Sequence, residues 1–94
     1  MNRPIQVGDL VISLAGRDKD RCYVVVEATL TRVKVIDGKL HKTFSPKTKN
    51  TKHIKQILTA RFTKLVEDIQ NGRLVSNKKL NKLINATKQK LQED

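Results

Sequence analysis

Residues 7–26 read VGDLVISLAGRDKDRCYVVV and contain two runs of β-branched and aliphatic residues, at positions 10–14 and 22–26. Runs of this kind, bounded by turn residues, favour β-strands. Between them, residues 15–21 are mostly charged, and charged side chains are rarely buried unless they are paired. Gly16 adds a residue that adopts positive φ without strain. This stretch therefore predicts two strands joined by an exposed loop.

A third strand and a tight turn follow. Residues 31–36 alternate for most of their length and place two valines on one face, which is typical of a strand. The next two residues, Asp37-Gly38, are a strong signal for a type I′ hairpin turn, because both central positions of that turn need positive φ. They predict a fourth strand around residues 40–44.

The rest of the N-terminal half contains one more short strand. Ser45-Pro46 ends the fourth strand, and residues 47–52 are polar and basic, which indicates a loop. The short apolar piece 54–58 predicts a fifth strand. Five short strands favour a small barrel over residues 1–58, because closing the sheet removes its exposed edges.

The apolar spacing changes to that of an amphipathic helix at Leu58. Gly72 is a suitable stop for this helix, and Ser76 is a suitable N-cap for a second one, with Val75 placed to contact Leu80 as a hydrophobic staple. The two apolar stripes consist of Leu58, Phe62, Leu65, Val66 and Ile69, and of Leu80, Leu83, Ile84, Thr87 and Leu91. Residues 59–94 are therefore predicted to form a helical hairpin, and the fold class is α+β. We expect the hairpin to pack on the barrel through Phe62 and Ile69, and the free chain to be a monomer.

The charge of the chain indicates an acidic partner. Its 94 residues include 20 Lys and Arg against 9 Asp and Glu, a formal net charge of +11. Such an excess is typical of domains that bind nucleic acid. The start of the chain contains no apolar signal core, and the longest apolar run, residues 22–26, is far too short to span a membrane. These features predict a cytoplasmic protein with no membrane partner.

No pattern of catalytic or metal-binding residues is found. Cys22, the single cysteine, lies in a β-branched run and is interpreted as a small buried hydrophobe. Together with His41 and His53 it does not give the paired spacing of a zinc site. The glycines are too widely spaced for a phosphate-binding loop, and the adjacent Glu67 and Asp68 point in different directions on a helix. We expect no enzymatic activity, no cofactor and no metal.

Uncompensated basic residues are the informative signal. Residues 39–56 contain no acidic residue but hold two histidines and six lysines, Lys39, Lys42, Lys47, Lys49, Lys52 and Lys55, all taken to be exposed. A solvated surface is one interpretation, and phosphate binding, which we favour, is the other. His53 could be a structural residue or a stacking and phosphate ligand.

Two further groups of basic residues are less clear. In the first loop, Asp18 and Asp20 interleave with Arg17, Lys19 and Arg21, and Asp18 could accept a hydrogen bond from a base or pair with Arg17. The lysines of the second helix could form a solubilising face or contact RNA; they are Lys78, Lys79, Lys82, Lys88 and Lys90.

Three segments together look like a KOW motif: residues 7–18, 22–26 and 33–38. The chain most closely resembles the small bacterial KOW-domain proteins that are similar to ribosomal protein fourteen of the archaeal and eukaryotic large subunit. The resemblance covers roughly residues 5–58, and residues 50–54 look like the closing segment of the family. It implies an SH3-like β-barrel that binds ribosomal RNA, with Gly16 and Arg17 at the contact surface. Many KOW segments carry a second glycine where this chain has Asp20, and a carboxylate there would weaken close approach of the backbone to phosphate.

The working hypothesis is a non-enzymatic RNA-binding protein that acts on ribosomal or other structured RNA in translation, with ribosomal proteins as possible neighbours. The alternative is an adaptor that docks a protein partner, or dimerises, through its C-terminal helices. The candidate RNA-binding residues are Gly16, Arg17, Lys19, Arg21, Lys39, His41, Lys42, Lys47, Lys49, Asn50, Lys52, His53 and Lys55.

Overall fold

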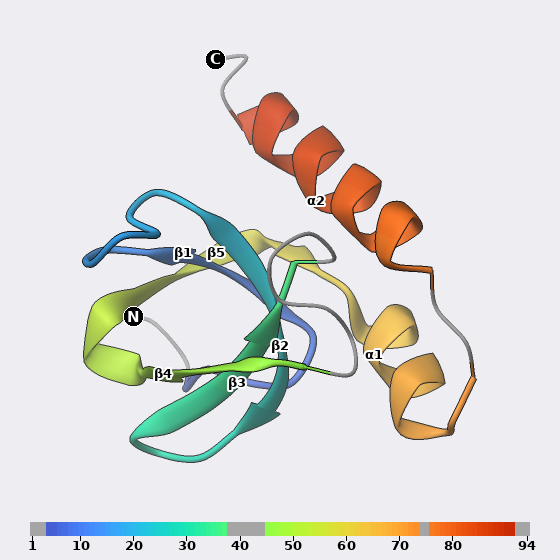
Figure 1. Ribbon diagram of the computed structural model, residues 1–94, viewed down its shortest axis with the longest axis horizontal. Helices are drawn as coiled ribbons and strands as arrows, with labels where there is room; N and C mark the ends of the chain where they lie inside the picture. The colour runs from blue at the N-terminus through green and yellow to red at the C-terminus, as the bar shows by residue number, and fades with distance from the viewer. Residues whose placement is uncertain (1–3, 38–44, 74–75, 92–94) are drawn as a thin grey trace.

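The computed structural model describes residues 4–37, 45–73 and 76–91 and has an α+β fold. Five antiparallel strands curl into a half-barrel, consistent with an SH3-like fold, and two helices follow (Figure 1). The strand order in the sheet is β4-β3-β2-β1-β5. In chain order the elements are β1 (Asp9–Ser13), β2 (Cys22–Ala28), β3 (Arg32–Ile36), β4 (Lys47–Asn50), the 3₁₀ helix η1 (Thr51–His53), β5 (Ile54–Arg61), α1 (Thr63–Gln70) and α2 (Asn77–Leu91).

Both faces of the central strands are buried, which explains why β1 and β2 read as continuous apolar runs. On one face, Leu10, Cys22 and Val24 join a core cluster that includes residues of both helices. The opposite face holds a second cluster inside the half-barrel, formed by Val11, Tyr23, Val25, Val33, Val35 and Ile54. The expectation that the two valines of β3 share one face is confirmed.

The fourth strand lies later in the chain than the sequence predicts. β4 occupies residues 47–50, which were expected to be a loop, and Val35 of β3 pairs with Lys47. This register leaves residues 37–46 between the two strands, so they are not joined by the two-residue turn expected at Asp37-Gly38; residues 40–44 lie outside the described residues. The apolar pattern could not reveal β4, because Lys47-Thr48-Lys49-Asn50 contains no apolar residue. Charged residues are common on an edge strand such as this one.

The first helix begins later than its apolar stripe suggests. β5 continues to Arg61, which pairs with Asp9, so the predicted division of the chain at residue 58 falls inside a strand. The predicted helix ends are confirmed. Gly72 has a φ of 76° just after α1, and the Ser76 hydroxyl accepts a hydrogen bond from the amide of Lys79 at 3.3 Å at the start of α2.

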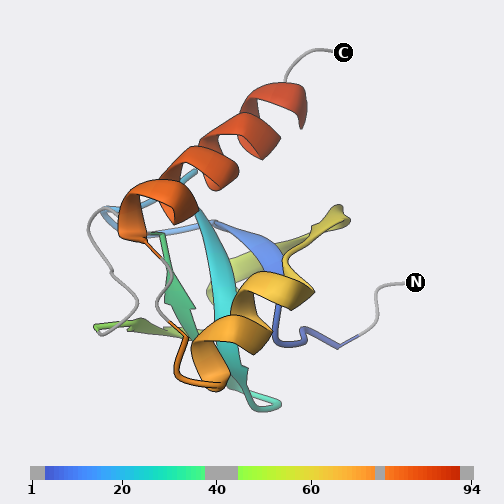
Figure 2. The same ribbon diagram turned by 90° about the vertical axis from the view of Figure 1, so that its right-hand side faces the viewer.

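The helices bury their apolar residues against the barrel. Val66 of α1 and Leu80 and Ile84 of α2 belong to the core cluster that contains β1 and β2, and Phe62 and Ile69 pack against it as expected. Figures 1 and 2 show that the helices follow one another around the sheet and do not lie side by side along their lengths. The barrel, more than the other helix, therefore covers each stripe.

Candidate nucleic-acid interface

The loop between β1 and β2 has a fixed conformation. Gly16 and Asp20 have φ values of 85° and 70°, both in the left-handed region. The amide of Asp20 donates to the carbonyl of Ser13 at 2.8 Å, and the amide of Arg21 donates to the carbonyl of Asp18 at 2.9 Å. Aspartate is one of the few residues other than glycine that tolerate positive φ. Asp20, where the KOW resemblance expects glycine, thus takes up a backbone conformation that glycine favours.

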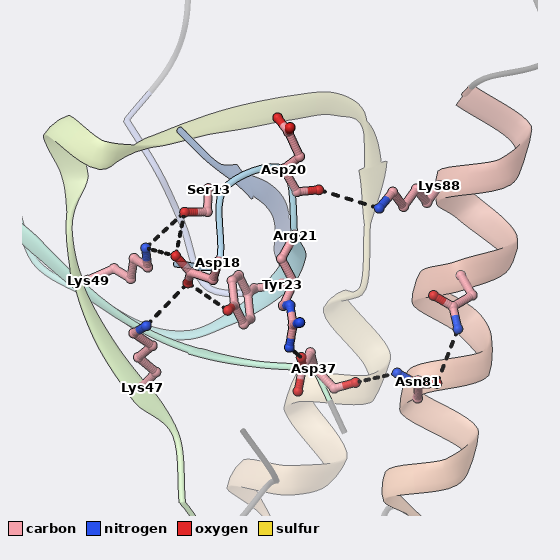
Figure 3. Close-up of polar contacts among 11 residues, drawn as sticks. Ser13, Asp18, Asp20, Arg21, Tyr23, Asp37, Lys47, Lys49, Asn81 and Lys88 are labelled. Carbon is pink, nitrogen blue, oxygen red and sulfur yellow. Dashed lines mark hydrogen bonds and ion pairs between the residues drawn. The ribbon is translucent and has the colours of Figure 1, made fainter. Parts of the chain in front are cut away.

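Asp18 anchors this loop from the inside, and four side chains donate hydrogen bonds to its carboxylate (Figure 3). Its Oδ1 accepts from the Ser13 hydroxyl at 3.0 Å and from Lys49 Nζ at 2.8 Å. Its Oδ2 accepts from the Tyr23 hydroxyl at 2.7 Å and from Lys47 Nζ at 3.3 Å. The Asp18 residue is only 7% exposed. Its negative charge is neutralised inside the half-barrel by Lys47 and Lys49 of β4. Asp18 thus pairs with the β4 lysines and not with Arg17, and its burial turns the carboxylate away from the surface that a base would reach.

The ionisation of this cluster follows from the contacts. Burial by itself raises the pKa of Asp18, but the hydrogen bonds from Lys49, Tyr23, Ser13 and Lys47 outweigh it and hold the pKa of the carboxyl well below its ordinary range. Burial, followed by the hydrogen bond to Asp18, raises the pKa of the Tyr23 hydroxyl well above its ordinary value. The cluster thus contains a carboxylate and a protonated phenol at neutral pH.

Two of the candidate RNA-binding lysines, Lys47 and Lys49, therefore pair with a carboxylate of the protein itself. Lys49 is only 9% exposed, and its ammonium group also donates to the Ser13 hydroxyl at 2.9 Å. The expectation that Lys49 lies on the surface is wrong. Lys49 pairs with the buried Val33, and directly opposed residues point to the same face of a sheet. The strand register could have revealed its inward direction, but no local sequence signal did. Lys47 is half-buried beside Asp18.

Arg21 faces the C-terminal helix and not the tip of its loop. Its Nη1 lies 3.7 Å from the carboxylate of the buried Asp37, whose carbonyl accepts from Asn81 of α2 at 3.3 Å. Lys88 of α2 donates to the carbonyl of Asp20 at 3.4 Å. These contacts, shown in Figure 3, border a cleft of about 200 Å³ between α2 and the barrel. No local sequence pattern predicts these contacts, because the loop and the helix lie far apart in the chain, 68 residues in the case of Asp20 and Lys88.

The single cysteine is buried, as its β-branched surroundings predicted. Cys22 lies in the core cluster, and burial raises the pKa of its thiol above the ordinary value, although the positive charge of Lys88 acts in the opposite direction. Because the thiolate is the reactive form, this setting makes the sulfur a weak nucleophile.

The remaining candidates gather at one end of the barrel, on the side away from α1 (Figure 1). The β1–β2 loop meets η1 there, since the amide of Leu14 donates to the carbonyl of His53 at 2.8 Å. The β2–β3 turn meets η1 from another side, since the amide of Thr51 donates to the carbonyl of Thr31 at 2.9 Å. We call this surface, formed by residues 14–20, 29–31 and 50–55, the loop end.

The loop end presents basic side chains from two distant segments. Its exposed candidates are Gly16, Arg17, Lys19, Asn50, Lys52, His53 and Lys55. The Asn50 side chain caps η1 by accepting from the amide of Lys52 at 2.9 Å, so its role here is structural. Lys39, His41 and Lys42 lie outside the described residues.

The cations of the loop end have no acidic partner within the part of the chain that the structure describes. Among the described residues, no carboxylate lies within ion-pair distance of Arg17, Lys19, Lys52 or Lys55. Asp18 is buried and neutralised, which leaves Asp20 as the exposed carboxylate of the β1–β2 loop. The surface of this loop is thus more basic than the alternating sequence of charges suggested.

Comparison with known proteins adds no further constraint: the sequence matches no protein-family model and no curated protein. Within the described ranges, no three His, Cys, Asp or Glu side chains come together in a way that could hold a metal ion. In the same part of the chain, no helix has the length and apolar character needed to cross a membrane. The geometry and charge of the loop end are therefore the basis for a functional proposal.

Proposed function

We propose that the protein is a non-enzymatic RNA-binding protein and that the loop end contacts the phosphates of a structured RNA. The observation that carries this proposal is the gathering of four exposed cations, Arg17, Lys19, Lys52 and Lys55, which have no acidic partner in the described part of the chain and come from two segments held together by backbone hydrogen bonds. Like charges gathered on one surface repel one another, and a bound anion relieves this repulsion. Nucleic acid supplies a regular array of such anions.

The composition favours contacts to phosphate and RNA shape. Aromatic residues make up only 3% of the chain, so stacking of successive bases on aromatic rings is a minor contribution at most. A fixed loop that carries arginine and lysine suits the phosphate geometry of a folded RNA. The KOW resemblance points to ribosomal RNA, with ribosomal proteins as neighbours and the cytoplasm as the place of action.

The adaptor alternative has less support. Val66, Leu80 and Ile84 of the two apolar stripes are buried in the core cluster with β1 and β2. On the described part of α2, Leu83, 36% exposed, is the large apolar side chain that faces solvent. A single exposed leucine is normal on a protein surface and does not mark an interface by itself.

The test compares two variants that lose the same charge. One replaces Arg17, Lys19, Lys52 and Lys55 by glutamine. The control replaces four exposed lysines outside the loop end by glutamine: Lys64, Lys78, Lys79 and Lys82. Affinity for a stem-loop RNA is measured across a range of salt concentrations, and circular dichroism checks folding.

The loop-end variant should lose the steep salt dependence that the wild type and the control keep. Four phosphate contacts correspond to a slope of roughly −3 to −4 in a plot of log affinity against log salt concentration, and the variant should approach zero. Equal losses in both variants would mean that the RNA responds to net charge alone. A wild-type slope near zero would remove the RNA-binding proposal.

A further inference from the structure

An exposed apolar groove lies beside the cations of the loop end. It encloses about 500 Å³, within the usual range of small-molecule pockets, and is lined by Pro4, Ile5, Ala28, Thr29, Leu30 and Thr51. Leu30, at the β2–β3 turn, is 90% exposed, the largest exposure among the exposed large apolar residues of the described chain. Covering this exposed leucine with a partner is favourable in free energy, because it removes apolar surface from water.

The groove is continuous with the basic surface. The Thr51 hydroxyl donates to the carbonyl of Leu30 at 3.3 Å, and Lys52 is the next residue along η1. Arg32, which follows the turn on the other side, is exposed. Another exposed leucine, Leu14, borders η1 from the β1–β2 loop, where its amide bonds to His53. Apolar side chains thus flank the 3₁₀ helix that carries Lys52.

We propose that this groove receives an unpaired base of the same RNA whose phosphates contact the loop end, so that the target is an RNA helix interrupted by a bulge or an internal loop. This inference rests on the proposed function. In a regular A-form helix the bases are stacked and paired, and their faces are closed to a protein side chain. A base extruded from the helix offers an apolar face to Leu30, while its flanking phosphates lie within reach of the neighbouring cations.

The two hydroxyl groups of the groove are bonded within the protein, so they contribute little to distinguishing one base from another. Thr29 Oγ1 already donates to the carbonyl of Arg32 at 3.1 Å and accepts from the amide of the same residue. Thr51 Oγ1 donates to the carbonyls of the turn. Because both hydroxyl protons are engaged, the base is held mainly by packing, and we expect weak discrimination among the four bases. Charge complementarity favours RNA over a protein segment, since the exposed cation Lys52 directly follows the lining residue Thr51 and the exposed Arg32 lies two residues after Leu30.

The experiment uses the full chain and two RNA hairpins that differ only in one unpaired adenine in the stem. Affinities are measured for the wild type, for Leu30→Ser, and for Leu83→Ser as a control at an exposed leucine of α2. The wild type should bind the bulged hairpin about tenfold more tightly, in keeping with the burial of one leucine side chain. Leu30→Ser should remove this preference and keep the affinity for the paired hairpin, and Leu83→Ser should change neither.

A fluorescent base distinguishes the groove from other contacts. With 2-aminopurine in place of the bulged adenine, binding of the wild type should change its fluorescence, and binding of Leu30→Ser should change it less. Equal wild-type affinity for the two hairpins would overturn the base-binding proposal and leave RNA binding intact. Equal weakening of both hairpins by Leu30→Ser would also overturn it. Failure of the wild type to bind either hairpin would remove the function on which it rests.

Discussion

Two pairs of lysines a few residues apart have opposite roles in this protein. Lys47 and Lys49 of β4 point toward the buried Asp18 and tie the β1–β2 loop to the sheet. Lys52 of η1 and Lys55 of β5 face solvent with no acidic partner among the described residues. The comparison shows that a lysine-rich stretch is not one binding surface. The strand register decides which ammonium groups are available to a ligand.

The largest effect is expected when the carboxylate that Lys47 and Lys49 share is removed. Asp18→Asn leaves the buried Lys49 without a countercharge, and removing one partner of a buried ion pair costs about 3–5 kcal/mol. We expect a loss near the lower end of this range in the free energy of unfolding by urea, because Lys47 is only half-buried. The matched control is Asp20→Asn in the same loop, where the carboxylate is exposed and the change should stay within about 0.5 kcal/mol. Similar losses of stability in the two variants would contradict the structural role of the buried Asp18.

Acid should weaken the same contacts. The pKa of Asp18 is depressed in the folded protein, so the folded state holds the charged form more strongly than the unfolded state does. Its contribution to stability is therefore fully present above the ordinary aspartate pKa of about 4 and is lost as pH falls below that value. Urea unfolding between pH 5 and pH 2 should show this loss in the wild type and a flatter profile in Asp18→Asn. Parallel profiles would show that other carboxylates dominate acid unfolding.

Single substitutions should distinguish the stabilising role of Lys49 from the RNA-binding role of Lys52. Lys49→Gln should lower the free energy of unfolding by about 2 kcal/mol, because Asp18 loses its closest cation while Lys47 remains. Lys52→Gln should leave stability within about 0.5 kcal/mol of the wild type and weaken RNA binding by a few-fold. Both variants are measured by urea unfolding and by RNA titration. The comparison fails if Lys49→Gln is neutral in unfolding or if Lys52→Gln destabilises the fold.

The smallest expected effect concerns the backbone of the β1–β2 loop. Asp20→Gly should raise the free energy of unfolding by roughly 0.5 kcal/mol, because glycine adopts the φ of 70° without strain, and should strengthen RNA binding by removing an exposed carboxylate. Gly16→Ala is the opposite change at a φ of 85°, and it should cost about 1 kcal/mol through backbone strain, since the added Cβ would make only an ordinary van der Waals contact with Asp18 Oδ1 at 3.6 Å. Thermal unfolding measures both. A stabilising Gly16→Ala would show that the loop relaxes its backbone.

The elements with a local signal were predictable. Continuous β-branched and aliphatic runs predicted β1 and β2, the alternation of residues 31–36 predicted β3, and the change of apolar period predicted two helices. The helix ends at Gly72 and Ser76 were also correct, because caps depend on residues adjacent in sequence. The exposed positions of Arg17, Lys19, Lys52 and Lys55 followed from the rule that unpaired charges stay in water.

By itself, then, the sequence predicted a small five-stranded barrel with two C-terminal helices and a large excess of positive charge. The sheet curls only into a half-barrel, with β4 and β5 at its edges. The tertiary structure alone decided that Lys47-Thr48-Lys49-Asn50 is a strand, that Asp18 turns inward to Lys49, and that Arg21 faces α2. The physical reason is the same in each case. These features depend on partners distant in the chain, and a buried charge is stable only where folding brings an opposite charge and hydrogen-bond donors to it.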